Sequence, residues 1–359
     1  MRTWVAFLLV GLGTVPAATA AVVGWSRPAE PVAAPTCARA RFTRTFDVGS
    51  FSKGNLHAHT SRSDGDSPPE DVIGWYRRAG YAFLAITDHN RFFEPARFEW
   101  LTDPNFVLLP GEEVTMTGGG RQVHVNALCT KQRIPGGTFG TAGTALEFAI
   151  DQVQRQGGVA IVNHPNFDHA LSAHDLLSAR GASLLEVMSG HPYVYSDGTA
   201  TRPAAEALWD YTLEQSLGLM AVAVDDEHRL RIDGDPPAYA GRGWVEVFGA
   251  ATDRAQICGA LRDGRLYASS GASLERIAVT ETAYSVWPSV PGATVTFLGA
   301  SGKELEQTGP LAASAPASHI LSGDESYVRA KIVAADGSRA WTPAVSVTRS
   351  TGQRCEPGP

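Results

Sequence analysis

Histidine and carboxylate side chains recur in the first two-thirds of this chain at positions that favour metal binding. Ten histidines occur in the 359 residues, and nine of them lie between His57 and His228. His57 and His59 are two positions apart, so in an extended segment both side chains point to the same side. Because imidazole binds metals and moves protons near neutral pH, this clustering predicts that the chemistry takes place in this part of the chain.

Further potential ligands lie in a turn and in or just after successive apolar runs. They are Asp64 in a Ser-Asp-Gly turn, Asp88-His89, Glu112-Glu113, His124, Asn163-His164 and Asp225-Asp226-Glu227-His228. Each alone has an ordinary interpretation as a solvated turn, a helix cap or a hydrogen-bonded core histidine. Their recurrence has no such ordinary interpretation, because burying many ionisable groups together is costly unless a cation compensates for their charge. The mixed nitrogen and oxygen ligands favour Mn, Zn or Fe over Ca or Mg, and their number predicts about two to three divalent metals.

The apolar runs alternate with segments that read as helices. Strands are expected at Asn55–His59, Tyr81–Thr87, Phe106–Leu109, Val123–Leu128, Val159–Val162, Leu184–Met188, Leu219–Val224, Trp244–Phe248 and Leu266–Ala268. Helices are expected at Asp71–Ala79, from Thr144 to Gly157, at His174–Arg180, at Ala204–Ser216 and from Thr252 to Arg262. Capping boxes at Ser67–Glu70 and Thr144–Glu147 support the first two helices. Roughly seven βα units favour a (β/α) barrel or a doubly wound sheet, in which functional groups gather at the carboxyl ends of the strands.

The pattern changes from about Ile277 onward. Short alternating runs such as Ala293–Phe297 and Tyr327–Ile332 are separated by glycine, serine and proline, which predicts a small all-β region. The expected organisation is a signal peptide or anchor at 1–20, a Pro/Ala-rich linker at 21–40, a barrel at 41–271, a β-sandwich-like domain at 272–349 and a tail at 350–359.

The N-terminal segment predicts export. No charge occurs from Thr3 to Trp25, and Ala18-Thr19-Ala20 fits the small-residue pattern of a cleavage site. The alternative is an uncleaved membrane anchor, because the uncharged run is about long enough to span a bilayer. Either interpretation places the folded part outside the cytoplasm, in the periplasm or the extracellular space, with membrane contact only if the segment stays uncleaved.

Four cysteines would then lie in an oxidising compartment, where three pairings are possible. Cys37 and Cys355 flank the predicted folded region, and domain termini are often close together, so a bridge between them is possible. Cys129 and Cys258 lie in apolar surroundings, where buried free thiols are the alternative.

The charge balance excludes one class of partner. The chain has 30 Lys+Arg against 37 Asp+Glu, a net charge of −7. A sequence-independent nucleic-acid binder needs a basic face, so we expect no stable nucleic-acid partner and a small-molecule substrate instead.

Five motifs resemble those of the PHP (polymerase and histidinol phosphatase) superfamily. They are LHAHTSRSDG at 56–65, ITDHN at 86–90, PGEEVT at 110–115, VNHP at 162–165 and DDEH at 225–228. They occur in the family's order and cover about residues 50–270. Within the superfamily, GWYRRAGYAFLAITDHN and ALRDGRLYASSGASLERIAV are most similar to a secreted branch related to carbaryl-type carbamate hydrolases.

The resemblance implies a distorted (β/α)7 barrel of PHP type with a small C-terminal all-β domain and a di- or trinuclear metal site. The implied metal ligands are His57, His59, Asp64, His89, Glu113, His124, His164, Asp226 and His228. Glu113 matches a bridging carboxylate, with Glu112 as the shift-by-one alternative. Asp88 and Asp225 would lie behind the ligands. His169, His174 and His191 match no motif and are interpreted as surface or substrate-side residues, and no chemistry is expected of His319.

These features predict a hydrolase that uses a metal-bound hydroxide, with Asp226 and Glu113 orienting or bridging. The expected substrates are small phosphate esters, a class that includes nucleotides, and Arg62, Arg91 and Arg121 are candidate phosphate contacts. One alternative is a carboxyl ester, carbamate or amide hydrolase, because substrate-side loops decide between these chemistries. A second alternative is a non-catalytic metal-binding or adhesion protein.

Overall fold

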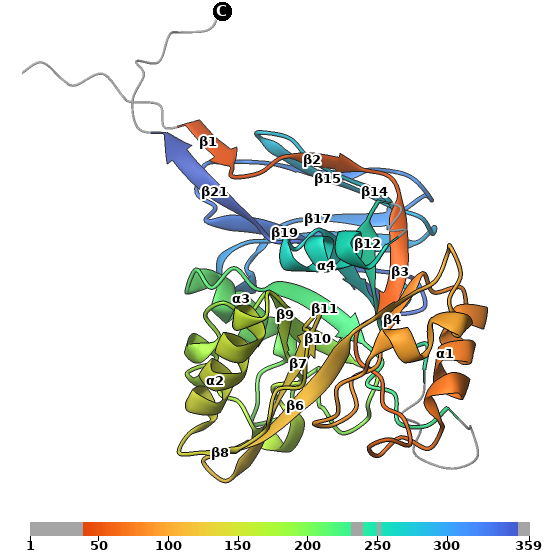
Figure 1. Ribbon diagram of the computed structural model, residues 1–359. Coiled ribbons are helices and arrows are strands. Elements are labelled where there is room, and N and C mark those ends of the chain that lie inside the picture. Colours follow the sequence, from red (N-terminus) through yellow and green to blue (C-terminus); the bar gives the residue numbers. More distant parts are fainter. Residues whose placement is uncertain (1–38, 231–239, 250–252, 351–359) are drawn as a thin grey trace, which may run out of the picture. The chain divides into compact units, whose positions relative to one another are not determined.

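The computed structural model describes residues 39–230, 240–249 and 253–350. Within these ranges the chain is a mixed α/β structure that is rich in strands (Figure 1). The α-helices are α1 (Pro69–Arg78), α2 (Ala142–Arg155), α3 (Ala205–Glu214) and α4 (Arg254–Arg262). Short 3-10 turns are η1 (Pro95–Arg97), η2 (Glu99–Leu101), η3 (Phe167–His169), η4 (Asp175–Ser178) and η5 (Ala300–Gly302). No helix among the described residues is long and apolar enough to cross a membrane.

The strands form three sheets. The first contains, in spatial order, β1 (Arg39–Phe42), β21 (Val345–Ser350), β19 (Tyr327–Val333), β20 (Arg339–Trp341), β13 (Leu266–Ser269), β12 (Trp244–Phe248), β3 (Phe51–Asn55), β4 (Phe83–Ala85) and β5 (Val107–Leu109). It also includes β16 (Ala293–Leu298), which pairs with β19, and β17 (Glu304–Leu311). The second contains β11 (Met220–Val224), β10 (Leu184–Ser189), β9 (Val159–Val162), β7 (Arg121–Leu128), β6 (Gly111–Gly118) and β8 (Thr138–Phe139). The third contains β18 (Ala317–Ile320), β15 (Ala283–Pro288), β14 (Leu274–Val279) and β2 (Phe46–Val48).

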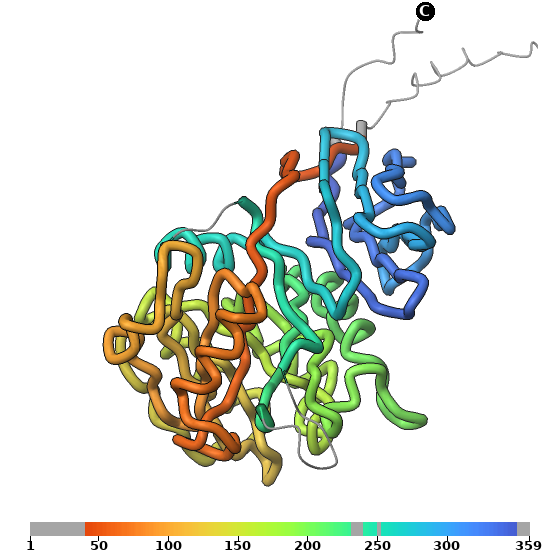
Figure 2. Tube along the Cα trace, turned by 90° about the vertical axis from the view of Figure 1, so that its right-hand side faces the viewer, coloured from red at the N-terminus to blue at the C-terminus, as the bar shows by residue number. Residues whose placement is uncertain are grey.

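The first strands of the described chain pair with its later ones. β1 is antiparallel to β21, and β2 is antiparallel to β14. Figure 2 shows this red N-terminal segment beside the blue C-terminal strands. β1 and β2 precede most of the barrel region expected from sequence, but they are edge strands whose partners, β21 and β14, come from residues after Ala272.

A closed (β/α)7 barrel is not what the strand pairing of the described residues gives. β3, β4 and β5 are parallel neighbours in the first sheet, and β9, β10 and β11 are parallel neighbours in the second. Between the two sets, isolated bridges join Ala58 to Glu227 and His89 to Glu113.

The expected βα alternation fails at β6 and β7, which pair as an antiparallel hairpin. Its turn is made by Gly119 and Gly120, whose φ angles of 60° and 80° suit the two-residue turns that connect such strands. Sequence analysis placed Glu112 and Glu113 after a strand, whereas both lie inside β6.

Several helix boundaries also differ from the expected ones. The residue before α1 is Pro68, with no side-chain cap, so Ser67 does not open that helix. Thr141 caps α2 and forms a reciprocal capping box with Thr144, which sequence analysis had taken as the cap itself. The helix expected at His174–Arg180 is only the short turn η4. Asp253 caps α4 by accepting from the Gln256 backbone N–H at 2.8 Å, while the expected cap, Thr252, lies outside the described residues.

The parallel strands of the first sheet and those of the second sheet pack against one hydrophobic core. Its fully buried members include Leu56, Phe83 and Leu109 on one side, and Ile161 and Val224 on the other. The nearly continuous apolar character of these strands follows from burial on both faces. The core therefore holds the two sets of strands together, and the polar residues that follow them are brought to one place.

A disulfide joins Cys129, directly after β7, to Cys258 in α4. Of the alternatives that the sequence left open for these two residues, the disulfide is therefore the one present, and buried free thiols are excluded. Their wide separation in sequence concealed the contact, because the pairing depends on packing of α4 against the strands. Cys37 and Cys355 lie outside the described residues.

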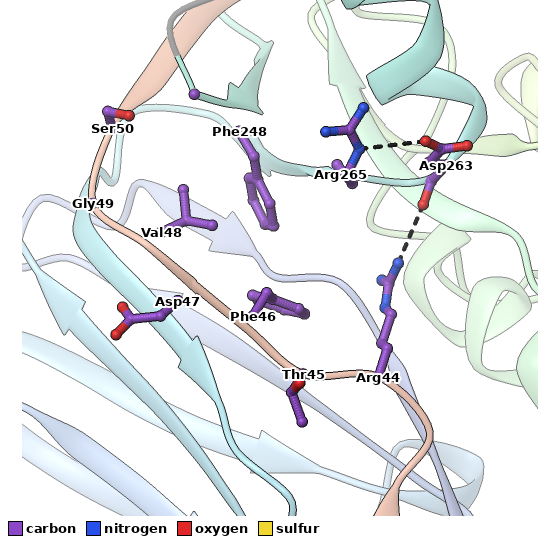
Figure 3. A pocket seen from close by; sticks show the side chains of 11 residues that line it. Arg44, Thr45, Phe46, Asp47, Val48, Gly49, Ser50, Phe248, Asp263 and Arg265 are labelled. Atoms are coloured by element: carbon purple, nitrogen blue, oxygen red, sulfur yellow. Dashed lines mark hydrogen bonds and ion pairs between the residues drawn. The ribbon is translucent and has the colours of Figure 1, made fainter.

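A cavity of about 490 Å³ lies at the start of β3, the end opposite to His57 (Figure 3). Phe46 and Phe248 form an apolar wall, and Arg44 donates a hydrogen bond to the Asp263 carbonyl oxygen at 3.2 Å. No histidine lines it, so it has no part in the site assembled at the other end of the strand.

Candidate metal centre

The loops after β3 and β11 are joined by backbone hydrogen bonds, which set the first potential ligands side by side. The His59 N–H donates to the Glu227 carbonyl at 2.8 Å, and the Asp226 N–H donates to the His57 carbonyl at 3.0 Å. Asp226 has a φ of 50°, a left-handed conformation that aspartate adopts more readily than most residues. The two loops therefore bring the His-x-His pair against Asp226.

The β6–β7 hairpin supplies the next ligands from one face. Glu113 is opposite Asn126, and His124 is opposite Thr115, so Glu113 and His124 are diagonal neighbours on the same side. The Asn163 side-chain amide donates to Glu113 Oε1 at 2.8 Å and to Asn126 Oδ1 at 2.9 Å. These contacts fix the Glu113 carboxylate next to the segment that carries His164.

One donor group combines four side chains. His57 Nε2 and His59 Nε2 are 3.1 Å apart. Glu113 Oε2 lies 3.2 Å from each of these nitrogens, and Asp226 Oδ1 lies 3.3 Å from each. All four residues are buried, with exposed fractions of 0–4%.

Two more donor groups adjoin the first. Glu113 Oε1 lies 2.9 Å from His124 Nδ1 and 3.4 Å from His164 Nε2. The third group, around Asp64, is more open: Asp64 Oδ2 lies 3.4 Å from both His89 Nε2 and His228 Nε2. The nine ligands expected from sequence are thus brought together by the fold.

The spacing of these atoms fits divalent metals. Nitrogen and oxygen ligands bind Zn²⁺ at about 2.0–2.2 Å, which places the corners of a tetrahedron about 3.3 Å apart. His57 Nδ1 is 2.7 Å from Glu186 Oε1, so a cation on the other side of the ring would find the proton on Nδ1 and a lone pair on Nε2. His124 Nδ1 is buried and near Glu113, yet has no hydrogen-bond partner. A cation between the donors would satisfy both nitrogens.

Burial and charge act against each other throughout the cluster. Burial raises the pKa of the Glu113 carboxyl, but His124, His57 and His89 outweigh it and hold this pKa well below its usual range. Burial lowers the pKa of His57, but the carboxylates of Asp226 and Glu113 raise it well above normal. The site therefore favours ionised carboxylates with positive charge beside them, which is the charge that bound metals would supply.

Other side chains hold the ligands in place from behind. Asp88 accepts from the Thr60 backbone N–H at 2.7 Å and from Ser63 Oγ at 2.9 Å, which orders the turn before Asp64. Asp225 accepts from the Tyr76 hydroxyl at 2.7 Å and from the Arg242 backbone N–H at 2.6 Å.

One such residue, Glu186, is not predicted from the sequence. It lies in β10, and its carboxylate accepts from His57 Nδ1 at 2.7 Å and from the His164 backbone N–H at 2.8 Å. The available signal was a single carboxylate inside the otherwise apolar run Leu184–Val187. Glu186 therefore orients two ligands that are distant in the sequence.

We expect Glu186→Gln to weaken metal binding about 10- to 100-fold, because a carboxylate behind a ligating histidine fixes its tautomer and raises its basicity. Competition with a chromophoric chelator measures this affinity. Glu246→Gln is the matched control, because Glu246 accepts from Trp244 Nε1 at 3.0 Å and is not part of the cluster. Equal affinities for the two variants would show that Glu186 has no such role.

A cavity of about 220 Å³ opens onto the donor groups. Its lining consists of Asp64, His89, Glu113, Gln122, His124, His164, Phe167, His191, Asp226 and His228. Burial lowers the pKa of His191 to about 4. Its Nδ1 accepts from the Tyr193 backbone N–H at 3.3 Å, which leaves Nε2 as a donor.

The remaining residues singled out in the sequence lie elsewhere. Arg62, Arg91 and Arg121 are not among the residues that line this cavity. Glu112 accepts from the Ile134 backbone N–H at 2.5 Å and is not part of the donor groups. His174 is exposed. His319 is buried, and its Nε2 lies 3.0 Å from Glu325 Oε1.

No family model and no curated protein matches this chain. Among solved structures, it is similar to a two-domain protein of Bacteroides vulgatus described as containing a PHP-like metal-dependent phosphoesterase. The identity is 15%, the match covers 89% of this chain and 99% of the other, and the TM-score is 0.43.

Two further similarities are to smaller structures. A protein of Bifidobacterium adolescentis described as a metal-dependent phosphoesterase matches at 15% identity over 58% of this chain and 95% of its own, with a TM-score of 0.41. An amidohydrolase of Chromobacterium violaceum, with bound sulfate and no metal, matches at 17% identity over 52% and 93%, with a TM-score of 0.38. Identities and TM-scores this low leave the function to be argued from the donor groups themselves.

Proposed function

We propose that this chain is a PHP-type metal-dependent hydrolase that acts on small phosphate esters. The observation that carries the proposal is the position of the Glu113 carboxylate within 3.4 Å of five imidazoles, from His57, His59, His89, His124 and His164. A carboxylate that has ring nitrogens near both of its oxygens would suit a ligand shared by two cations, which supports a cluster of about two or three divalent metals.

When bound, such cations polarise the substrate oxygen, activate water and stabilise developing negative charge. The chain's own residues set the geometry. Glu113 and Asp226 fix the spacing of the ligands, Glu186 holds the proton of His57 on Nδ1, and His191 presents an N–H at Nε2 to the cavity. His191 can therefore donate a hydrogen bond to a substrate oxygen.

A carboxyl ester, carbamate or amide hydrolase is the second candidate. One observation favours it: none of the residues lining the cavity is lysine or arginine, so a phosphate would depend on the metals alone for charge compensation. Carbonyl substrates do not need a cationic side chain.

We also propose that the chain is exported, which the N-terminal uncharged segment supports. The Cys129–Cys258 disulfide supports the same proposal, because disulfides persist mainly in oxidising compartments.

A parallel screen tests the proposed function. Phosphomonoesters, phosphodiesters, carboxyl esters and carbamates are compared in Mn²⁺ and Zn²⁺, before and after chelation, alongside elemental analysis. We expect at least about two metal ions per chain and hydrolysis that chelation abolishes and added metal restores. Less than about one metal per chain, with no chelator-sensitive activity, would contradict the proposal.

A further inference from the structure

A second cavity, of about 430 Å³, adjoins the metal cavity. It is lined by Gln122, Phe167, Asp168, His169, Tyr193 and Tyr195, and it shares Gln122 and Phe167 with the cavity over the donor groups. Gln122 Oε1 is 3.1 Å from Nε2 of the potential ligand His124. A molecule whose reacting group lies at the metal cluster therefore has direct access to this second space.

The wall between the two cavities is a continuous series of rings. The Phe167 ring centroid lies 5.2 Å from that of His164 and 6.4 Å from that of His191. The His191 ring is in turn 5.6 Å from that of Tyr193. These separations are mostly in the range of favourable aromatic contacts, so a planar group can continue the series outward from the cluster.

The aromatic residues at the outer end are unusually exposed. Only four large hydrophobic residues among those described are strongly exposed, and Tyr193 and Tyr195, at 51% and 47%, are two of them. Exposed apolar surface beside a cavity is typical of a binding site, because leaving it in water is unfavourable. Both side chains lie on the loop after β10, at the rim of the second cavity.

The loops that carry these rings are fixed in place. The Asn166 side-chain amide donates to the Tyr195 carbonyl at 3.1 Å and to the Pro203 carbonyl at 2.9 Å. Asp168, His169 and Tyr195 all have φ near 50°, the left-handed region that few non-glycine residues adopt. These uncommon backbone conformations, together with the Asn166 hydrogen bonds, indicate a preformed surface.

A third cavity lies on the other side of Gln122 and has a different character. It is about 380 Å³, and it is lined by polar residues that include Asn90, Thr115, Thr117 and Arg133. Because the aromatic residues are confined to the Tyr193 side, a ring has one favourable direction in which to extend from the cluster.

We propose that this site takes substrates that carry a planar ring next to the scissile group, and that the ring binds against Phe167, Tyr193 and Tyr195. The proposal rests on the proposed function only in placing the reacting group at the metal cluster. Tyr193 and Tyr195 are specificity residues, not catalytic ones, because they do not reach the donor atoms.

The first test compares phenylphosphonate with methylphosphonate, which are not hydrolysed, by calorimetry on metal-loaded protein. Wild type is expected to bind the phenyl compound about three- to tenfold more tightly. The double variant Tyr193→Ala/Tyr195→Ala should bind both equally. Trp100→Ala, which removes an exposed ring at 69% exposure, and Arg133→Ala, in the polar cavity, should keep the wild-type preference.

A second measurement separates this proposal from the proposed function. Saturation-transfer NMR detects phenylphosphonate ring protons on chelator-treated protein, where the metals play no part. The aromatic site is supported if the ring protons show saturation transfer with wild type and with Trp100→Ala but not with the double tyrosine variant. This result holds even if no hydrolysis is found. Equal saturation in all three proteins, or none in any, together with equal affinities for the two phosphonates, would overturn it.

Discussion

Glu113→Gln is expected to remove most of the bound metal and to lower kcat/KM by roughly a thousand-fold or more. The reason is that both carboxylate oxygens face ligands: Oε2 lies 3.2 Å from His57 and His59, and Oε1 lies 2.9 Å from His124. An amide has one oxygen acceptor and no charge, so it cannot bridge two cations, each of which supplies several kcal/mol of transition-state stabilisation. Elemental analysis and initial rates measure the two effects.

Glu112→Gln is the control for this substitution. It makes the same carboxylate-to-amide replacement at the adjacent residue of the same strand. The Glu112 side chain, however, contacts the Ile134 backbone instead of the cluster. Metal content and rate should stay near those of wild type. If Glu112→Gln were the variant that lost metal, the bridging ligand would be misassigned by one position.

Loss of the Cys129–Cys258 disulfide is expected to produce the largest change in stability. The bridge joins residues that are 129 positions apart in the sequence. Closing a loop of this length lowers the entropy of the unfolded chain, which corresponds to roughly 5 kcal/mol of added free energy of unfolding. Measured disulfides more often contribute about 2–4 kcal/mol. The variant Cys129→Ala/Cys258→Ala should therefore unfold about 5–10 °C below wild type in a thermal melt.

Reduction of the wild-type protein provides the comparison, since it opens the same bridge without replacing a side chain. The double variant is melted with the same reductant, so that any bridge between Cys37 and Cys355 is open in both samples. Reduced wild type and the double variant should melt together, below the oxidised protein. A double variant that melts within about 1 °C of oxidised wild type would show that packing of α4 alone fixes this region.

The ligand positions were the most predictable part of the site. His57, His89, His164 and Asp226 follow apolar strands, and carboxyl ends of parallel strands meet at one edge, so their convergence could be inferred without coordinates. Each of these residues alone has an ordinary interpretation, and it is their recurrence after successive strands that predicts metal binding. The substrate roles proposed for Arg62, Arg91 and Arg121 stay predictions.

The pairing of strands was less predictable. Glu113 and His124 meet because β6 and β7 form an antiparallel hairpin, whereas the alternation of apolar runs indicated successive parallel strands. Apolar runs show that a strand is buried, but they do not show its direction or its neighbour. For the same reason, the contact of Glu186 with the His164 backbone N–H depends on the register of β10 with β9, which no local pattern specifies.

The aromatic rim was invisible in the sequence for a different reason. Phe167, Tyr193 and Tyr195 lie in loops, where no periodicity relates one side chain to another. Their proximity depends on single contacts such as those of the Asn166 amide. His191, interpreted as a surface or substrate-side residue, does line the metal cavity.

The pairing of β1 with β21 bears on the order in which the protein can assemble. On the ribosome β1 emerges first of the described strands, and its partner emerges last. Until then β1 has no partner, and a free strand edge is a template for aggregation. This edge of the first sheet can therefore close only when the whole of the described chain is available, which makes the β1–β21 pairing a late step of folding.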